Sequence, residues 1–183
     1  MSVQTDAFST LVTTYKDRAL SLALRLLKDR DDAEDALQEA FVKAYQGMTA
    51  FRGESRTSTW FFRIVYNTCL NVLKKRRRQP AHDVLDEDVT SVWTEPVVFD
   101  TIDRAVLEDV LRDELERMPP LYAAVMDLFY VQECSYEQIC RITAMPLGTV
   151  KTRLNRGRSL LRAAVVARCP DLVDTGLTER THE

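Results

Sequence analysis

The sequence predicts an all-α protein of two small helical domains joined by an acidic linker. Apolar residues recur at the three- and four-residue spacing of amphipathic helices, and no run shows the two-residue alternation of a strand. Only five glycines and six prolines interrupt the 183 residues. These observations favour helices over any sheet.

Charge divides the chain in the same way. Residues 60–80 hold six lysines and arginines and no acid, and residues 147–168 repeat that count. Between them, residues 83–117 hold twelve acids against three arginines. Two basic blocks predict two anion-binding surfaces, and the acidic block predicts a segment that separates or shields them.

Composition restricts the class of protein. The chain is 45% hydrophobic and 29% charged, with a formal net charge of −3, which suits one or two small cores. No stretch approaches the roughly 20 apolar residues that cross a bilayer, and the N-terminus does not resemble a signal peptide. We therefore expect a cytoplasmic protein without membrane insertion. The four cysteines form no CxxC pair, neither histidine is spaced with them, and no nucleophile–base pair or glycine-rich phosphate loop occurs. We expect no metal, no cofactor and no catalytic residue.

Residues 1–80 form the first predicted domain. Apolar spacing indicates a helix over 6–28, and a second helix begins near Asp32, where acidic side chains suit the positive end of the helix dipole. The stretch GMTAFRGESRT is a loop, and a third helix covers 58–78. Three helices of this kind predict a small bundle.

The remaining chain predicts a linker, a second domain and a tail. Residues 81–103 are polar, acidic and bounded by proline, as in a linker. Residues 104–168 hold the second domain: a helix over 102–117, another after the double proline, a short helix opened by the capping box SYEQ, a break at AMPLG, and a final helix. The last two helices predict a helix-turn-helix, and residues 169–183 a loose tail.

The third helix has two chemically different sides. Its buried arc comprises Phe61, Phe62, Val65, Cys69, Val72 and Leu73. Its opposite side comprises Trp60, Arg63, Asn67, Asn71 and Lys74. An indole, amides and cations suit single-stranded nucleic acid, because the ring stacks on bases, amides read base edges and cations neutralise phosphates. The alternative is a solvated face with the tryptophan folded onto a neighbouring helix; the five successive cations at 74–78 weigh against it, because like charges repel without an anion.

The second helix also carries two stripes. Small and apolar residues make the core stripe: Ala33, Ala36, Leu37, Ala40, Phe41 and Ala44. The outer stripe holds Asp35, Gln38, Glu39 and Val42. An apolar side chain among acids predicts a protein-docking surface, although a merely solvated face is the alternative.

The final helix predicts a duplex-reading surface. Its narrow apolar stripe is Val150, Leu154, Gly157 and Leu161. The exposed residues of its first turns are Lys151, Thr152, Asn155, Arg156 and Ser159. Such side chains can pair with base edges in the major groove, while Arg158 and Arg162 would contact phosphates. A basic surface helix of some other bundle is the alternative.

Three ordered motifs resemble the extracytoplasmic-function group of bacterial sigma factors. They are DAEDALQEAFVKAY, FRGESRTSTWFFRIVYNT and SYEQICRITAMPLGTVKTRLNRGRSLLR, within a resemblance that covers about residues 6–168. The resemblance implies a protein that binds core RNA polymerase, through the β′ clamp helices and the β subunit, and promoter DNA. It also implies an anti-sigma partner that covers the polymerase-binding surfaces.

The resemblance assigns roles residue by residue. Asp35, Gln38, Glu39 and Val42 match the surface that grips the β′ clamp helices. Phe51 and its loop match a pocket for a base flipped from the -10 element, and Trp60, Phe62, Arg63 and Asn67 match the helix that holds that strand, with Phe62 lining the pocket from below. Lys151, Thr152, Asn155 and Arg156 match the -35 readers, where Thr152 replaces the serine usual in the family.

The expected function is that of an alternative sigma factor, which reads the -35 duplex and the melted -10 strand. A stand-alone helix-turn-helix regulator is the first alternative, and it would occupy duplex DNA without polymerase. An adaptor whose basic helices bind an acidic protein is the second, and it would show no preference among DNA sequences. The acidic linker is expected to lie in the basic channel of polymerase, or against the basic helices when polymerase is absent.

Overall fold

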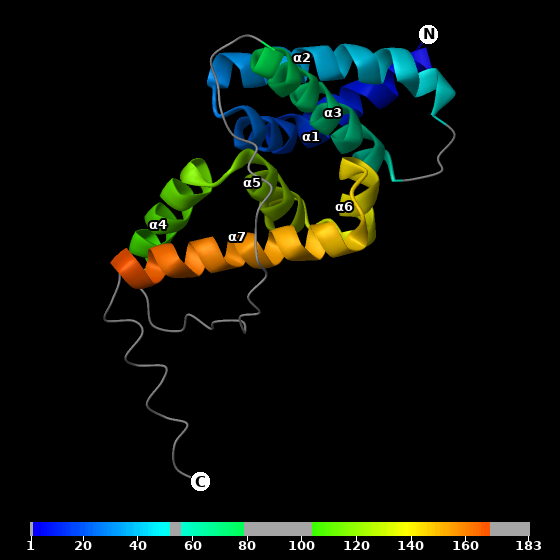
Figure 1. The fold of residues 1–183 in the computed structure, drawn as a ribbon. Coiled ribbons are helices and arrows are strands. Elements are labelled where there is room, and N and C mark those ends of the chain that lie inside the picture. The colour runs from blue at the N-terminus through cyan, green and yellow to red at the C-terminus, as the bar shows by residue number, and fades with distance from the viewer. Residues whose placement is uncertain (1, 52–55, 79–103, 169–183) are drawn as a thin grey trace.

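The computed structural model describes residues 2–51, 56–78 and 104–168. Every regular element in these ranges is a helix, which confirms the predicted all-α class (Figure 1). The elements are α1 (Ser2–Leu27), α2 (Arg30–Gly47), the 3-10 turn η1 (Met48–Ala50), α3 (Thr57–Arg78), α4 (Arg104–Arg117), α5 (Pro120–Met126), the π-helical turn η2 (Asp127–Val131), α6 (Tyr136–Thr143) and α7 (Leu147–Arg168). The predicted acidic linker and C-terminal tail lie outside the described residues.

Helices α1, α2 and α3 pack against one another as the predicted bundle. The side chain of Asp29 caps α2 by accepting a hydrogen bond from the backbone N–H of Asp32 at 2.9 Å. Four buried alanines of α2, at 33, 36, 40 and 44, present small side chains to the neighbouring helices. Phe61 of α3 is fully buried and stacks on Phe41 of α2, with ring centroids 5.2 Å apart.

Helices α4 to α7 form the second group. Both bonds of the predicted capping box are present at α6: the Ser135 hydroxyl accepts from the Gln138 backbone N–H at 3.3 Å, and the Gln138 side chain accepts from the Ser135 N–H at 2.7 Å. Ala144, in the left-handed conformation with φ 57°, ends α6. Gly157 lets α7 approach α5 closely, because a Cβ there would lie 2.7 Å from Cγ and Sδ of Met126. Val150, Leu154 and Gly157 are buried as expected.

The two groups of helices contact each other directly (Figure 1). Helix α1 packs on α5 and η2, and α3 packs on α6, so buried residues of both groups form one continuous cluster. The sequence suggested two modules linked only by a tether, and it contained no sign of this contact. Within the described residues, no helix combines the length and the apolar character needed to span a membrane.

Candidate functional site

The outer face of α2 is exposed as its periodicity predicts. Asp35, Gln38 and Glu39 lie in solvent, and Val42 is 55% exposed although it is apolar. Glu39 pairs with Lys43 at 2.6 Å within the helix. Tyr45 extends this patch one turn further: it is 42% exposed, and its ring lies edge-on to Phe8 at 5.1 Å. The sequence reasoning did not select Tyr45, although its spacing from Val42 places both on one side of the helix.

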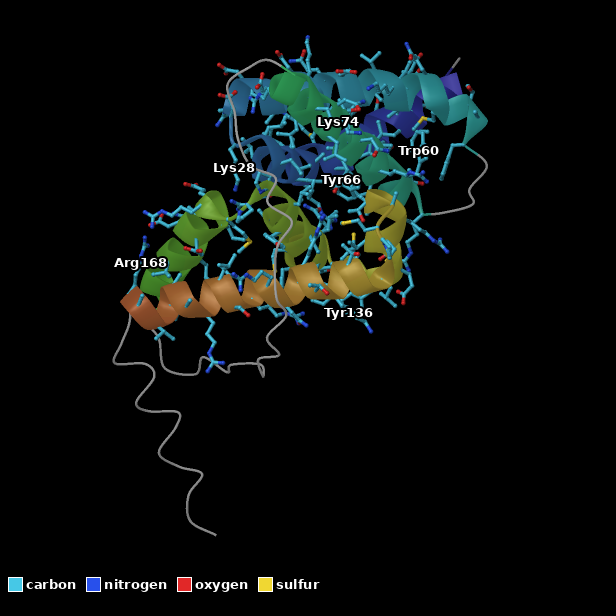
Figure 2. The ribbon with its side chains drawn as sticks, viewed as in Figure 1. Lys28, Trp60, Tyr66, Lys74, Tyr136 and Arg168 are labelled. Carbon is cyan, nitrogen blue, oxygen red and sulfur yellow. The ribbon has the colours of Figure 1, made fainter. Side chains whose placement is uncertain are left out.

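The outer face of α3 exposes four of its five predicted residues. Arg63, Asn67, Asn71 and Lys74 are all exposed. Trp60, near the start of the same helix, is only half-exposed (Figure 2). Its ring packs against Phe51, with centroids 4.9 Å apart, so the tryptophan is partly folded onto a neighbour, as the alternative interpretation held. Phe51 and Trp60 therefore form an aromatic corner at one end of a polar and cationic row.

Phe62 corrects one expectation. The resemblance placed it among the residues that hold a DNA strand, yet its side chain is only 1% exposed. Its ring lies 5.8 Å from that of Tyr15, and the guanidinium of Arg18 is 6.0 Å from the ring centroid. In this conformation Phe62 belongs to the core and no base can reach it, as its position on the helical wheel indicated.

The basic run at the end of α3 is partly used inside the fold. Arg76 forms an ion pair with Asp32 and donates to the carbonyl oxygen of Leu27 at 3.0 Å. Lys74 and Lys75 are exposed, and Arg77 and Arg78 have no described side chains. An internal acid therefore balances one of the five cations, which weakens the argument that the whole run needs an external anion.

The exposed face of α7 is confirmed at its most polar positions. Lys151, Thr152 and Arg156 are exposed, and Asn155 and Ser159 are half-buried. The Thr152 hydroxyl donates its proton to the Gly148 carbonyl oxygen at 2.9 Å, and its side chain is exposed.

Arg158, predicted to contact phosphates, also makes contacts within the fold. Its Nε donates to the Tyr130 hydroxyl at 2.7 Å, and its guanidinium lies 5.6 Å from the ring centroid of Phe129 and 5.7 Å from that of Tyr130. These contacts join α7 to η2. Sequence spacing could not reveal them, because the partners are 28 residues apart.

Two family models match the two groups of helices. The model for sigma-70 region 2 matches residues 11–79, and the model for sigma-70 region 4 matches residues 108–161. The presence of both regions disfavours a stand-alone helix-turn-helix regulator, which would need only the second. The class of protein is thus that of a sigma-70-type transcription initiation factor.

Comparison with curated relatives shows to which family within this class the chain belongs. The chain is 34% identical to the RNA polymerase sigma-H factor of Pseudomonas aeruginosa over 166 residues, 87% of this chain and 86% of that protein. It is 35% identical to the ECF RNA polymerase sigma-E factor of Haemophilus influenzae over 162 residues, with 85% of each chain covered. For the ECF sigma factor SigW of Bacillus subtilis the identity is 32% over 86% of this chain and 88% of SigW. The chain belongs to the ECF family of sigma factors, and it directs promoter-specific transcription as an alternative sigma factor.

Solved structures share the fold. The sigma factor RpoE of Bartonella quintana, solved with the anti-sigma factor NepR, superposes with a TM-score of 0.64 at 24% identity and covers 87% of this chain and 96% of its own. CnrH, solved with the cytosolic domain of CnrY, superposes with a TM-score of 0.61 at 19% identity. The match covers 89% of this chain and 90% of CnrH.

Proposed function

We propose that this sigma factor uses three separate surfaces in initiation. The outer face of α2, with Asp35, Gln38, Glu39 and Val42, docks on core RNA polymerase. The outer face of α3 binds the unpaired -10 strand, and the first turns of α7 read the -35 duplex. The observation that carries the proposal is the division of α3 into a mainly apolar inner side and an exposed row of two amides and two cations.

Strand capture by α3 follows from chemistry that a duplex cannot offer. Arg63 and Lys74 neutralise phosphates, and Asn67 and Asn71 meet base edges that pairing would hide. The half-exposed Trp60, supported by Phe51, provides a stacking surface at the end of this row. Stacking is worth about 1–3 kcal/mol per base, and extruding a base costs a few kcal/mol, so a few contacts are enough to favour the melted state. Melting of the -10 element then requires no added source of chemical energy.

Duplex reading by α7 uses its exposed first turns. Arg156 and Lys151 can pair with guanine, Asn155 with adenine, and Thr152 with a base or a thymine methyl group. Each well-formed pair contributes about 1–3 kcal/mol of discrimination. Arg158 is already held by Tyr130, so we assign it to holding the helix in place and not to phosphate binding.

The outer face of α2 suits a protein partner. An apolar side chain in the middle of acidic and amide side chains offers a desolvated centre with a polar rim. RpoE was solved in complex with the anti-sigma factor NepR, and CnrH was solved in complex with the cytosolic domain of CnrY. We expect an anti-sigma factor to cover the α2 surface of this chain as well, and we expect the protein to act in the cytoplasm, where its polymerase is found.

Transcription by core polymerase on a promoter library tests the proposal. Core enzyme with the chain should initiate from a defined promoter set, and core enzyme alone should not. Asn67→Ala should change the preferred bases within the -10 element, and Arg156→Ala should change them within the -35 element. Lys16→Ala, an exposed cation on α1, serves as a control that leaves both preferences unchanged. If both substitutions reduced transcription from all promoters equally, Asn67 and Arg156 would not be the residues that read bases.

A further inference from the structure

One arginine of α7 is held by aromatic side chains that come before the helix-turn-helix in the chain. Nε of Arg158 donates to the Tyr130 hydroxyl at 2.7 Å, and the guanidinium lies within cation–π range of the Phe129 and Tyr130 rings. Those two rings belong to η2 and meet edge to face, with centroids 4.9 Å apart. Phe129 in turn stacks on Tyr136, the first residue of α6, at 5.4 Å (Figure 2). The position of the guanidinium is therefore fixed by side chains of η2.

The same guanidinium also bonds to one of the predicted base readers. Nη1 of Arg158 donates to Oδ1 of Asn155, one turn earlier on α7, at 3.4 Å. A guanidinium has donors only, so the amide turns its oxygen toward Arg158 and its NH2 group away from it. Among the described residues, that NH2 group has no hydrogen-bond partner. Asn155 is half-buried, and the part of its amide that stays available is the donor part.

This orientation decides which base Asn155 can recognise. An asparagine pairs with adenine when its amide presents both the oxygen and the nitrogen, because the major-groove edge of adenine offers one donor and one acceptor. The amide oxygen of Asn155 faces Arg158 instead, so NH2 donors are left for the base. Guanine suits such donors, since its N7 and O6 are both acceptors. The cation beside the amide acts in the same direction, because it attracts acceptor atoms and repels the amino group of adenine.

We infer that Arg158, anchored by Tyr130, is a positioning residue that turns the Asn155 amide and so makes Asn155 select guanine over adenine in the -35 duplex. This inference rests on the proposed function, in which the first turns of α7 lie in the major groove. Arg158 acts through Asn155 and not by contact with a base. Tyr130 contributes to base selection in the same way, although it lies outside the helix that reads the duplex.

Binding of the sigma–polymerase complex to a pool of duplexes randomised across the -35 element tests the inference. Sequencing of the bound duplexes gives the preference among the four bases at each position. Asn155→Ala should remove the preference at a single position, which identifies the base that Asn155 contacts. With the wild-type chain, guanine should exceed adenine at that position by at least about fivefold, because a well-formed pair discriminates by about that factor or more.

Arg158→Ala should change the preference at that same position. The released amide can present both its oxygen and its nitrogen, so we expect the advantage of guanine over adenine to fall below about twofold. Tyr130→Phe keeps both rings and removes only the hydroxyl that accepts from Nε, so it should cause a smaller shift in the same direction with little loss of stability. Added to Asn155→Ala, Arg158→Ala should cause no further shift, because the arginine acts through the amide.

Arg162→Ala is the matched control. Arg162 is exposed on the same helix and, as a phosphate contact, its loss should weaken binding of all sequences alike and leave the base preferences unchanged. The inference is overturned if Arg158→Ala and Tyr130→Phe also weaken all sequences alike, or if Arg158→Ala still shifts the preference when Asn155 is already alanine. A wild-type preference for adenine at the Asn155 position would overturn it as well.

Failure of the proposed function gives a different result. If the wild-type complex shows no base preference across the -35 element, or if Asn155→Ala and Arg156→Ala change no position, α7 does not read the duplex. The inference about Arg158 then falls together with that part of the proposed function.

Discussion

At the scale of single residues, Phe62 and Trp60 show where the helical wheel and the family resemblance lead to different predictions. The helical wheel places Phe62 inside and Trp60 outside, whereas the resemblance places both against DNA. The structure buries Phe62 completely and leaves Trp60 half-exposed against Phe51. The helical wheel therefore predicted the burial of Phe62 better than the family resemblance did. Contact between side chains on different elements, as for Trp60 and Phe51, is beyond what periodicity can predict.

Cysteine reactivity gives a prediction at this scale. Burial raises the pKa of the Cys69 thiol to about 12, so Cys69 stays neutral and unreactive at pH 8. Burial likewise raises the pKa of Cys134 to about 11. Among the three cysteines in the described residues, Cys140 is half-buried, so we expect iodoacetamide to alkylate it before Cys69 and Cys134 in the folded protein, as peptide mass spectrometry would report. Alkylation of Cys69 as fast as Cys140, without unfolding, would contradict the buried position.

Arg158 gives a second prediction. Arg158→Ala removes the bond to Tyr130 and the contacts with two aromatic rings, and we expect the free energy of unfolding to fall by about 1–2 kcal/mol. Arg162→Ala, an exposed arginine on the same helix, should change it by less than about 0.5 kcal/mol. Urea titration measures both. Equal losses for the two variants would mean that the aromatic contacts contribute nothing to stability.

At the scale of helices, local signals in the sequence predicted most of what the structure contains. Both hydrogen bonds of the capping box SYEQ form, and the alanine stripe of α2 is buried. Each of these features could be predicted because it depends only on residues within a turn or two. The π-helical turn η2 was not predicted. Its cause is tertiary: Asp127 and Gln132 meet partners on α1 that are more than 100 residues away. The one local sign was a lone acid within the apolar run AAVMDLF.

Two glycines of α7 provide a matched pair at this scale. A Cβ at Gly157 would collide with the buried Met126 side chain, so Gly157→Ala should lower the free energy of unfolding by about 1–2 kcal/mol. A Cβ at Gly148 would meet nothing within 4 Å, so Gly148→Ala should raise it by about 0.5–1 kcal/mol through helix propensity. Thermal unfolding measures both. A stabilising Gly157→Ala would show that α5 and α7 do not approach as closely as described.

At the scale of the whole molecule, the sequence predicted the two helical groups but not their contact. Charge blocks and periodicity predict the helices of each group because they are properties of each segment taken alone. The contact between the groups joins buried apolar side chains and a few polar side chains that lie 106 and 114 positions apart in the sequence, and no periodic pattern reveals such a contact.

We propose that α3 captures an unpaired strand while α7 reads the duplex. The most direct measurement compares two ligands of the sigma–polymerase complex: a single-stranded -10 oligonucleotide and a -35 duplex fragment. Asn67→Ala should weaken binding of the oligonucleotide about tenfold and leave the duplex unaffected, and Arg156→Ala should do the reverse. If Asn67→Ala binds the oligonucleotide as tightly as the wild-type chain, the exposed row on α3 does not hold the melted strand.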